Sequence, residues 1–348
     1  MKKRNLCTAI GAAIGMLILI LDGKTALAGA ADGITLCMTT LVPSLFPFFL
    51  LSILLTGAVS GHTAPLLKPV AAACKIPNGA ESLLAIGLLG GYPVGAQNVA
   101  LLHRNGQLTD SQAARMIVFC NNAGPAFIFG ILGSMFSDPV APWLLWGIHI
   151  VSALLVGIVL PGNIPERPVS TPERPIRFTD ALERAIKVMA LVCGWVILMR
   201  MVLHFLERWF LWLLPKTAQV VVAGILELSN GCIGLAQLES EGLRFVIAAG
   251  LLSLGGICVT LQTASVAEGI SMKQYFPGKI LQCSISVLLA CLIQSTISPS
   301  MRTHFVTASL AAAGVCAICL VIFSVFKKIV EFRPQLVYNR SNKDNEVR

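Results

Sequence analysis

The sequence is poor in charged residues, which occupy 12% of its 348 positions, about half of the share in soluble globular domains. This shortage excludes an ordinary cytosolic enzyme and a nucleic-acid-binding protein. A disordered chain is excluded too, because disorder needs low hydrophobicity, whereas 55% of these residues are hydrophobic. The net charge of +9 therefore points to a membrane rather than to nucleic acid.

Motifs of common catalytic and cofactor sites are also missing. The sequence contains no G-x-S-x-G, H-E-x-x-H or Walker loop, and no G-x-G-x-x-G in the required context. The 11 cysteines are scattered, mostly inside apolar runs, which does not fit a disulfide framework. Cys316 and Cys319 form a lone C-x-x-C without a second ligand pair. We expect no enzyme, metal site or cofactor, so any transport would be passive or driven by an ion gradient.

Long apolar runs fill most of the sequence, and runs of about 18 or more residues are typical of membrane spans. The uninterrupted runs, of which the first is short, cover residues 6–21, 34–59, 143–160, 188–206, 280–297 and 305–326. Residues 108–136 and 243–267 form two further runs, broken at Asn121–Pro125 and Gly255–Gly256. Together these runs predict about eight membrane spans.

Two apolar stretches carry helix breakers at their centres. Residues 82–102 are interrupted by Gly90–Pro93, and residues 218–238 by Ser229–Gly231. Each stretch therefore predicts a re-entrant hairpin, in which two short helices meet at a tip.

The basic residues predict the orientation, because cytoplasmic loops collect Lys and Arg. With the N-terminus in the cytoplasm, 20 of the 26 Lys and Arg lie in cytoplasmic segments, including residues 268–279, and five in outer segments. Arg200 lies within a span and either reaches the outer surface near Glu207 or pairs with Glu227. We predict an all-α, multi-pass protein of the cell membrane with both termini in the cytoplasm. The alternative for residues 1–28 is a signal peptide, cleaved after Ala26–Ala28.

A proline-rich segment, Pro161–Arg177, divides the spans into two halves and cannot be helical. Both halves run span, hairpin, broken span, span, and an odd number of spans separates matching elements. This order predicts the inverted repeat of secondary transporters. The expected parts are an N-terminal span with an amphipathic connector (1–33), the first repeat (34–160), a linker (161–180), the second repeat (181–297), and a C-terminal span with a basic tail (298–348).

The breaks form the candidate binding site. Unpaired backbone groups in lipid cost several kcal/mol each, so broken helices persist only against protein or a wet cavity. Half-helix N-termini attract anions, and unwound carbonyls attract cations. We therefore predict a polar cavity near the midplane. The expected substrate-binding residues are Tyr92, Gln97, Asn98, Asn121, Asn122, Ser229, Asn230, Gln262 and Thr263.

These polar groups have structural alternatives. The asparagine pair of the first broken span could only cap a kinked helix, and the polar residues after Gly256 could only bond neighbouring helices. Gly87, Gly91 and Gly95 form a small-xxx-small ridge that could pack helices. His149 is expected to be a packed, hydrogen-bonded core residue.

Glu227 is the sharpest single candidate, because an ionisable group inside a membrane marks a functional site by default. It could bind a coupling cation, relay a proton, or pair with Arg200. The alternative is a shallow hairpin in which the carboxylate reaches water.

Several segments resemble the YlbJ-type sporulation integral membrane proteins of the nucleoside-recognition, or Gate-domain, group. The first-half segments are LVPSLFPFFL (41–50), GLLGGYPVGAQ (87–97) and FCNNAGPAFIFG (119–130). The second-half segments are ILELSNG (225–231) and LGGICVTLQ (254–262). The resemblance covers about residues 30–300, and the group is similar in layout to concentrative nucleoside transporters and to the membrane part of ferrous-iron permeases.

The resemblance implies a role in spore formation, namely movement of dipicolinic acid, a small aromatic dicarboxylate, toward the forespore. The motif positions carried over are Tyr92, Pro93, Gln97, Asn121, Asn122, Glu227 and Asn230. The second hairpin lacks the Tyr-Pro pair, so the halves are expected to differ in role. The Glu227 carboxylate would repel a bound dianion unless it is protonated or holds a coupling cation.

Four partners are expected: the lipid bilayer, a small polar or anionic solute, a coupling cation and a second copy in a homo-oligomer. Two alternatives to this function remain open. One is a nucleoside or ion transporter of the Gate-domain group, and the other is a non-transporting membrane assembly factor for sporulation.

Overall fold

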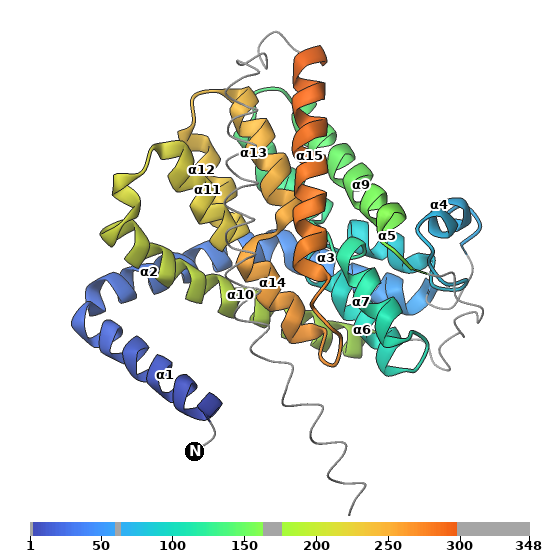
Figure 1. Cartoon of the computed structure of the whole chain (residues 1–348), viewed down its shortest axis with the longest axis horizontal. Helices are drawn as coiled ribbons and strands as arrows, with labels where there is room; N and C mark the ends of the chain where they lie inside the picture. The colour runs from blue at the N-terminus through green and yellow to red at the C-terminus, as the bar shows by residue number, and fades with distance from the viewer. Residues whose placement is uncertain (1–2, 60–63, 163–175, 298–348) are drawn as a thin grey trace, which may run out of the picture.

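The computed structural model describes residues 3–59, 64–162 and 176–297, and all regular structure within these ranges is helical (Figure 1). Five helical stretches are long and apolar enough to cross a membrane: Gly23–Ala58, Ala141–Val159, Phe178–Trp209, Glu241–Val266 and Tyr275–Gln294. The prediction of an all-α chain with several membrane-crossing helices is confirmed to this extent. Most of the proline-rich linker and the predicted span 305–326 lie outside the described residues.

The N-terminal region differs from its predicted layout. Helix α1 (Lys3–Leu21) projects from the body in Figure 1, and its apolar part, Ala9–Leu21, is shorter than a span. The predicted connector is helix α2 (Gly23–Leu36), which continues through a π-helical turn, η1 (Cys37–Leu41), into α3 (Val42–Val59). Packing explains this helix, because Gly29 and Gly33 let α2 approach the backbone of α10 (Phe178–Trp209) closely.

Both predicted hairpins consist of two short helices. The first pairs α5 (Ser82–Leu89) with α6 (Val94–Arg104), and its break falls at Gly90–Pro93 as predicted. The second pairs α11 (Lys216–Leu226) with α12 (Leu228–Gly234). Its break lies at Glu227, so the predicted break at Ser229–Gly231 is wrong. Glu227 leaves the helical conformation, and its carboxylate caps the N-terminus of α12.

Both predicted helix breaks are present, although only Glu241–Val266 is long and apolar enough to cross a membrane. Helix α7 (Asp110–Phe119) starts at a capping box formed by Thr109 and Gln112, and α8 (Pro125–Gly130) starts at a proline. The five residues between them are not helical. Helix α13 (Glu241–Leu254) meets α14 (Gly256–Val266) at Gly255, whose φ of +71° ends α13.

The remaining helices complete two packed groups (Figure 1). Helix α10 packs along α2 and α3, whereas α9 (Ala141–Val159) packs with α13 and α15 (Tyr275–Ile297). The short elements are α4 (Lys68–Ala73), η2 (Leu132–Met135), η3 (Leu211–Leu213) and η4 (Leu235–Gln237). The order of spans, hairpins and broken spans is the same in both halves, while their opposite orientation stays a prediction.

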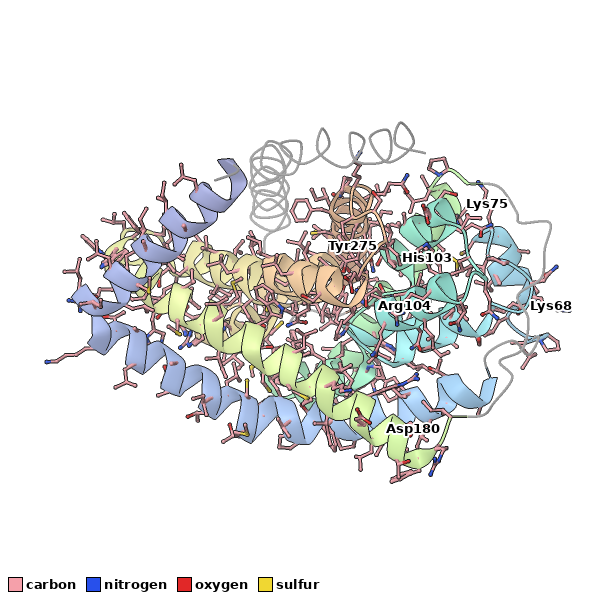
Figure 2. All side chains as sticks on the ribbon, turned by 90° about the horizontal axis from the view of Figure 1, so that it is seen from below. Lys68, Lys75, His103, Arg104, Asp180 and Tyr275 are labelled. Carbon is pink, nitrogen blue, oxygen red and sulfur yellow. The ribbon has the colours of Figure 1, made fainter. Side chains whose placement is uncertain are left out.

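Several predicted cytoplasmic residues lie at one end of the molecule. Figure 2 shows Lys68, His103, Arg104 and Asp180 there. Not every basic residue predicted to lie in a cytoplasmic loop is exposed there. Arg115 and Lys279, for which loop positions were predicted, are 5% and 0% exposed. Two of the 20 predicted loop charges are therefore core residues.

Candidate functional site

Three of the four breaks line one small central cavity of about 40 Å³. Gly90–Tyr92 come from the first hairpin, Ala123–Gly124 from the first broken span, and Glu227–Ser229 from the second hairpin. Gln262 of α14 and apolar side chains of α3 and α10 complete the lining. A water needs roughly 10–15 Å³ and ligand pockets typically measure about 300 Å³ or more, so this cavity has room for a few waters at most.

Glycines bring the first two breaks into contact. A Cβ atom on Gly124 would lie 3.0 Å from Gly91 Cα, and Cβ atoms on Gly87 and Gly95 would lie 2.1 and 1.9 Å from the Cys120 carbonyl oxygen. The predicted small-residue ridge thus packs directly against the break between α7 and α8. The contact between these glycines and the α7–α8 break also forms part of the cavity wall. The glycines therefore serve both helix packing and the cavity.

Asn121 joins this break to the second half of the chain. Its Oδ1 accepts from the Ala96 N–H at 3.2 Å. Its Nδ2 donates to Thr263 Oγ1 at 2.9 Å and to the Tyr275 hydroxyl at 3.0 Å. Asn121 is fully buried, so its amide links α6, α14 and α15 inside the protein.

Asn122 belongs to a second buried network centred on Lys279. The Lys279 ammonium donates to the Asn121 carbonyl (2.6 Å), Gln282 Oε1 (2.9 Å) and Asn122 Oδ1 (3.3 Å). Gln282 Nε2 also donates to Asn122 Oδ1 at 3.0 Å. The asparagine pair therefore faces a cation of the protein itself.

Tyr92 connects the central cavity to the fourth break. Its hydroxyl donates to the Leu252 carbonyl at 3.2 Å, in the last turn of α13. A Cβ atom on Gly255 would lie 3.3 Å from Tyr92 Cζ. The Lys279 nitrogen lies 5.2 Å from the centre of the Tyr92 ring, within the range of a cation–π interaction. The ring thus separates the Lys279 charge from the cavity.

Glu227 lies at the centre of the second half. Its two carboxylate oxygens accept from the backbone N–H groups of Ser229 (3.0 Å) and Asn230 (2.8 Å). The side chain is buried and lines the central cavity, so the alternative of a carboxylate exposed to water does not hold. Arg200 does not bond it. Instead, Arg200 lies 3.5 Å from Glu207 and 3.4 Å from Asp32.

Those charges belong to a larger open cavity of about 470 Å³, which we call the vestibule. Its lining includes the polar or charged side chains of Asp32, Thr35, Thr39, Thr40, Arg200, Glu207, Lys216, Gln219, Asn230 and Gln237. Asn230 is 9% exposed, and its Nδ2 has no hydrogen-bond partner in the described part of the chain. Because Glu227 lines the central cavity and binds the Asn230 N–H, the first turn of α12 separates the two spaces.

Comparison with known proteins connects this site to one kind of membrane protein. No family model matches the chain, and no solved structure shows a significant match. The chain is similar to the sporulation integral membrane protein YlbJ of Bacillus subtilis, with 24% identity over 300 residues, which cover 72% of this chain and 73% of that protein. The predicted YlbJ-type resemblance is confirmed. The match and the five long apolar helices support an integral membrane protein.

The predicted site residues fall into three groups. Tyr92, Ser229 and Gln262 line the central cavity together with Glu227, and Asn230 lines the vestibule. Asn121, Asn122 and Thr263 are buried in the networks behind Tyr92. Asn98 donates to the Val94 carbonyl in its own helix, and Gln97 is half-buried. Neither Gln97 nor Asn98 lines one of the two cavities.

His149 is a core residue, as predicted. Its Nε2 accepts from the Ala123 N–H at 3.0 Å, so the ring hydrogen is on Nδ1, which donates to Ser253 Oγ at 3.1 Å. Ser253 bonds Ser286, which donates to Ser152. This chain of side chains joins the α7–α8 break to α13, α15 and α9.

The polar face of α15 was not predicted from the sequence. Tyr275, Lys279, Gln282 and Ser286 recur at spacings of four, three and four residues, so they share one helix face. That polar stripe in an otherwise apolar helix is the signal that could have revealed them. Among the described residues, no cluster of three or more His, Cys, Asp or Glu side chains could hold a metal ion.

Proposed function

We propose that this protein is a membrane transporter for a small polar solute rather than an enzyme. The observation that supports this proposal most strongly is that three helix breaks line one central cavity. An open polar vestibule lies one helical turn away. Broken helices meeting at a buried site are the binding arrangement of many secondary transporters. The central cavity is too small for the solute, which corresponds to a state in which the solute has not passed α12. An inverted repeat, cytoplasmic termini and assembly as a homo-oligomer are part of the same proposal.

Dipicolinate is the proposed solute, moved toward the forespore during sporulation. The family resemblance implies this small aromatic dicarboxylate, and the name of the similar protein places that protein in sporulation. Arg200, Lys216 and the unpartnered Asn230 amide give the vestibule donors for a carboxylate. Glu227 is the proposed partner of a coupling cation or proton, which would offset the charge of the dianion.

One observation favours a second candidate, a non-transporting assembly factor for sporulation. Asn121 and Asn122 are fully buried, and their amides are bonded within the protein. On that account the breaks serve packing, and alanine at Asn121, Asn122 or Gln97 would lower stability without changing any flux.

Thermal unfolding of the purified protein in detergent tests the proposal against a panel of ligands. The panel contains dipicolinate, several nucleosides, sodium and iron(II). A solute at about 100 times its Kd should add roughly 2.7 kcal/mol to the free energy of unfolding. A shift with dipicolinate supports the proposal, and a shift only with nucleosides or iron(II) would move it to another branch of the Gate-domain group. No shift in the panel and no dipicolinate uptake into liposomes would favour the assembly factor.

A further inference from the structure

Lys279 is a buried cation that no carboxylate in the described part of the chain pairs with. It lies in the second turn of α15 and is 0% exposed. None of the ion pairs formed within residues 3–59, 64–162 and 176–297 includes it. Removing an ammonium group from water costs several kcal/mol, so its surroundings must replace the lost hydration.

The replacement consists of three oxygens and two aromatic rings. An ammonium group has three hydrogens, and Asn121 O, Asn122 Oδ1 and Gln282 Oε1 accept one each at 2.6–3.3 Å. The rings of Tyr92 and Tyr275 lie 5.2 and 5.8 Å from the nitrogen. This set of groups is a cation site in which every donor is used.

The strongest ligand of this site is available because of Pro125. In a continuous helix, the Asn121 carbonyl would accept from the N–H of residue 125. Proline has no N–H, so the break leaves this carbonyl without its helical donor. The carbonyl also follows the C-terminal end of α7 (Asp110–Phe119), where the helix dipole is negative. The break therefore creates a cation-binding oxygen, and Lys279 occupies it.

Unwound carbonyls of this kind coordinate the coupling ion in many secondary transporters. We propose that the Lys279 ammonium is a tethered cation that fills the ion site of the α7–α8 break, so that this break takes no cation from solution. A mobile coupling cation would then be left to the second half, at Glu227. The tethered cation is tested by protein stability alone, and the proposed transport by uptake. The transport proposal can therefore fail while the tethered cation is supported, and the tethered cation can fail while transport is supported.

Replacing Lys279 by alanine should open the site to cations from solution. The deleted atoms correspond to propylammonium, which serves as the probe alongside sodium and potassium, with choline chloride as the reference at equal ionic strength. We expect Lys279→Ala to lower the Tm of the purified full chain by about 5 °C or more in choline. Propylammonium should restore about half of this loss or more, because it binds the folded state.

Two matched variants separate a cation site from general packing. Lys279→Met fills the same space without donors, so it should lose stability and gain nothing from any cation. Lys273→Ala removes an exposed lysine of the preceding loop and should match the unmodified chain in every salt. If Lys279→Ala aggregates in choline, recovery of monodisperse protein in propylammonium gives the same answer.

Rescue of Lys279→Ala but not of Lys279→Met supports the tethered cation. The inference would be overturned if Lys279→Ala unfolded no earlier than the unmodified chain. It would also be overturned if propylammonium, sodium and potassium all failed to restore the stability or the recovery of Lys279→Ala.

Discussion

At the scale of single residues, the buried charges of the two halves are each held by the backbone of a broken helix. Glu227 accepts two N–H groups at the start of α12, and Lys279 donates to a carbonyl that follows the end of α7. Each charge therefore faces the end of a helix whose dipole has the opposite sign. Glu227 and the Tyr92 ring both line the central cavity, and the Lys279 nitrogen lies 5.2 Å from the centre of that ring.

Replacing Glu227 by glutamine should separate its roles in capping and transport. A glutamine side chain has one acceptor oxygen instead of two, so one cap bond is lost and the free energy of unfolding should fall by about 1 kcal/mol. Uptake of dipicolinate into proteoliposomes should fall about tenfold or more, since the carboxylate charge is gone.

Glu239→Gln is the matched control, because Glu239 is exposed and lines neither cavity. It should keep both stability and uptake. Normal uptake by Glu227→Gln would remove Glu227 from the transport mechanism.

Glu227 was predicted from the sequence and Lys279 was not, for one physical reason. A carboxylate between apolar residues is conspicuous in the sequence wherever the helices around it begin and end. Lys279 lies next to a polar segment, and the surplus of basic residues on the cytoplasmic side assigned it to a loop. Its burial depends on α15 starting at Tyr275 rather than near residue 280 and on the carbonyl that Pro125 leaves free.

At the scale of the elements, close backbone contacts hold the breaks together. The first hairpin lies with Gly87 and Gly95 against the Cys120 carbonyl, where no side chain fits. The Asn121 amide then connects this break to α14 and α15. The breaks are therefore ordered parts of the fold.

Alanine at Gly95 should be much more costly than alanine at a glycine without such contacts. Its Cβ would lie 1.9 Å from the Cys120 carbonyl oxygen, so the backbone must move. Overpacking of this kind costs about 1–3 kcal/mol or more of unfolding free energy, measured by thermal or denaturant unfolding. Gly194→Ala in α10 is the control, because its Cβ meets nothing within 4 Å. Equal stability of the two variants would contradict the packing described for the first hairpin.

A double-mutant cycle measures how Asn121 couples the halves. Asn121→Ala leaves the buried Ala96 N–H without its acceptor, and Tyr275→Phe removes one partner of the Asn121 amide. Residues in one buried network typically couple by about 0.5–3 kcal/mol, so the double variant should be less destabilised than the sum of the single variants. Additive losses of unfolding free energy would show that the two side chains act independently.

The breaks were mostly predictable because glycine, proline and asparagine interrupt apolar runs at each of them. The second hairpin is the exception, since its break depends on the Glu227 side chain bonding back to the α12 backbone. The helical conformation of α2 was not predicted, because it depends on contact with α10, which no local pattern encodes. The convergence of the breaks on one cavity followed from their matching order in the two halves.

At the scale of the whole molecule, the vestibule and one end of the protein, where predicted cytoplasmic residues lie, are predicted to face opposite sides of the membrane. Lys68 and Arg104 lie at that end in Figure 2, on segments predicted to be cytoplasmic. The vestibule is lined by Lys216 and Gln237, from segments predicted to face outward.

Cysteine labelling in intact cells tests this sidedness. A membrane-impermeant maleimide should modify Gln237→Cys directly and Lys68→Cys only after permeabilisation, because both positions are exposed but on opposite sides. The unmodified chain is the background control, since its described cysteines are buried or half-buried. The reverse pattern would invert the predicted orientation.

The most direct test of solute binding is protection of a cysteine at position 230. Asn230 lines the vestibule beside the Glu227 carboxylate, whereas Asn121 is sealed behind Tyr92. A small water-soluble thiol reagent should modify Asn230→Cys and leave Asn121→Cys unmodified. Dipicolinate at about ten times its Kd should slow modification of Asn230→Cys about tenfold, because it occupies most of the sites. Modification at a rate that dipicolinate does not change would contradict a solute site at the junction of the vestibule and the helix breaks.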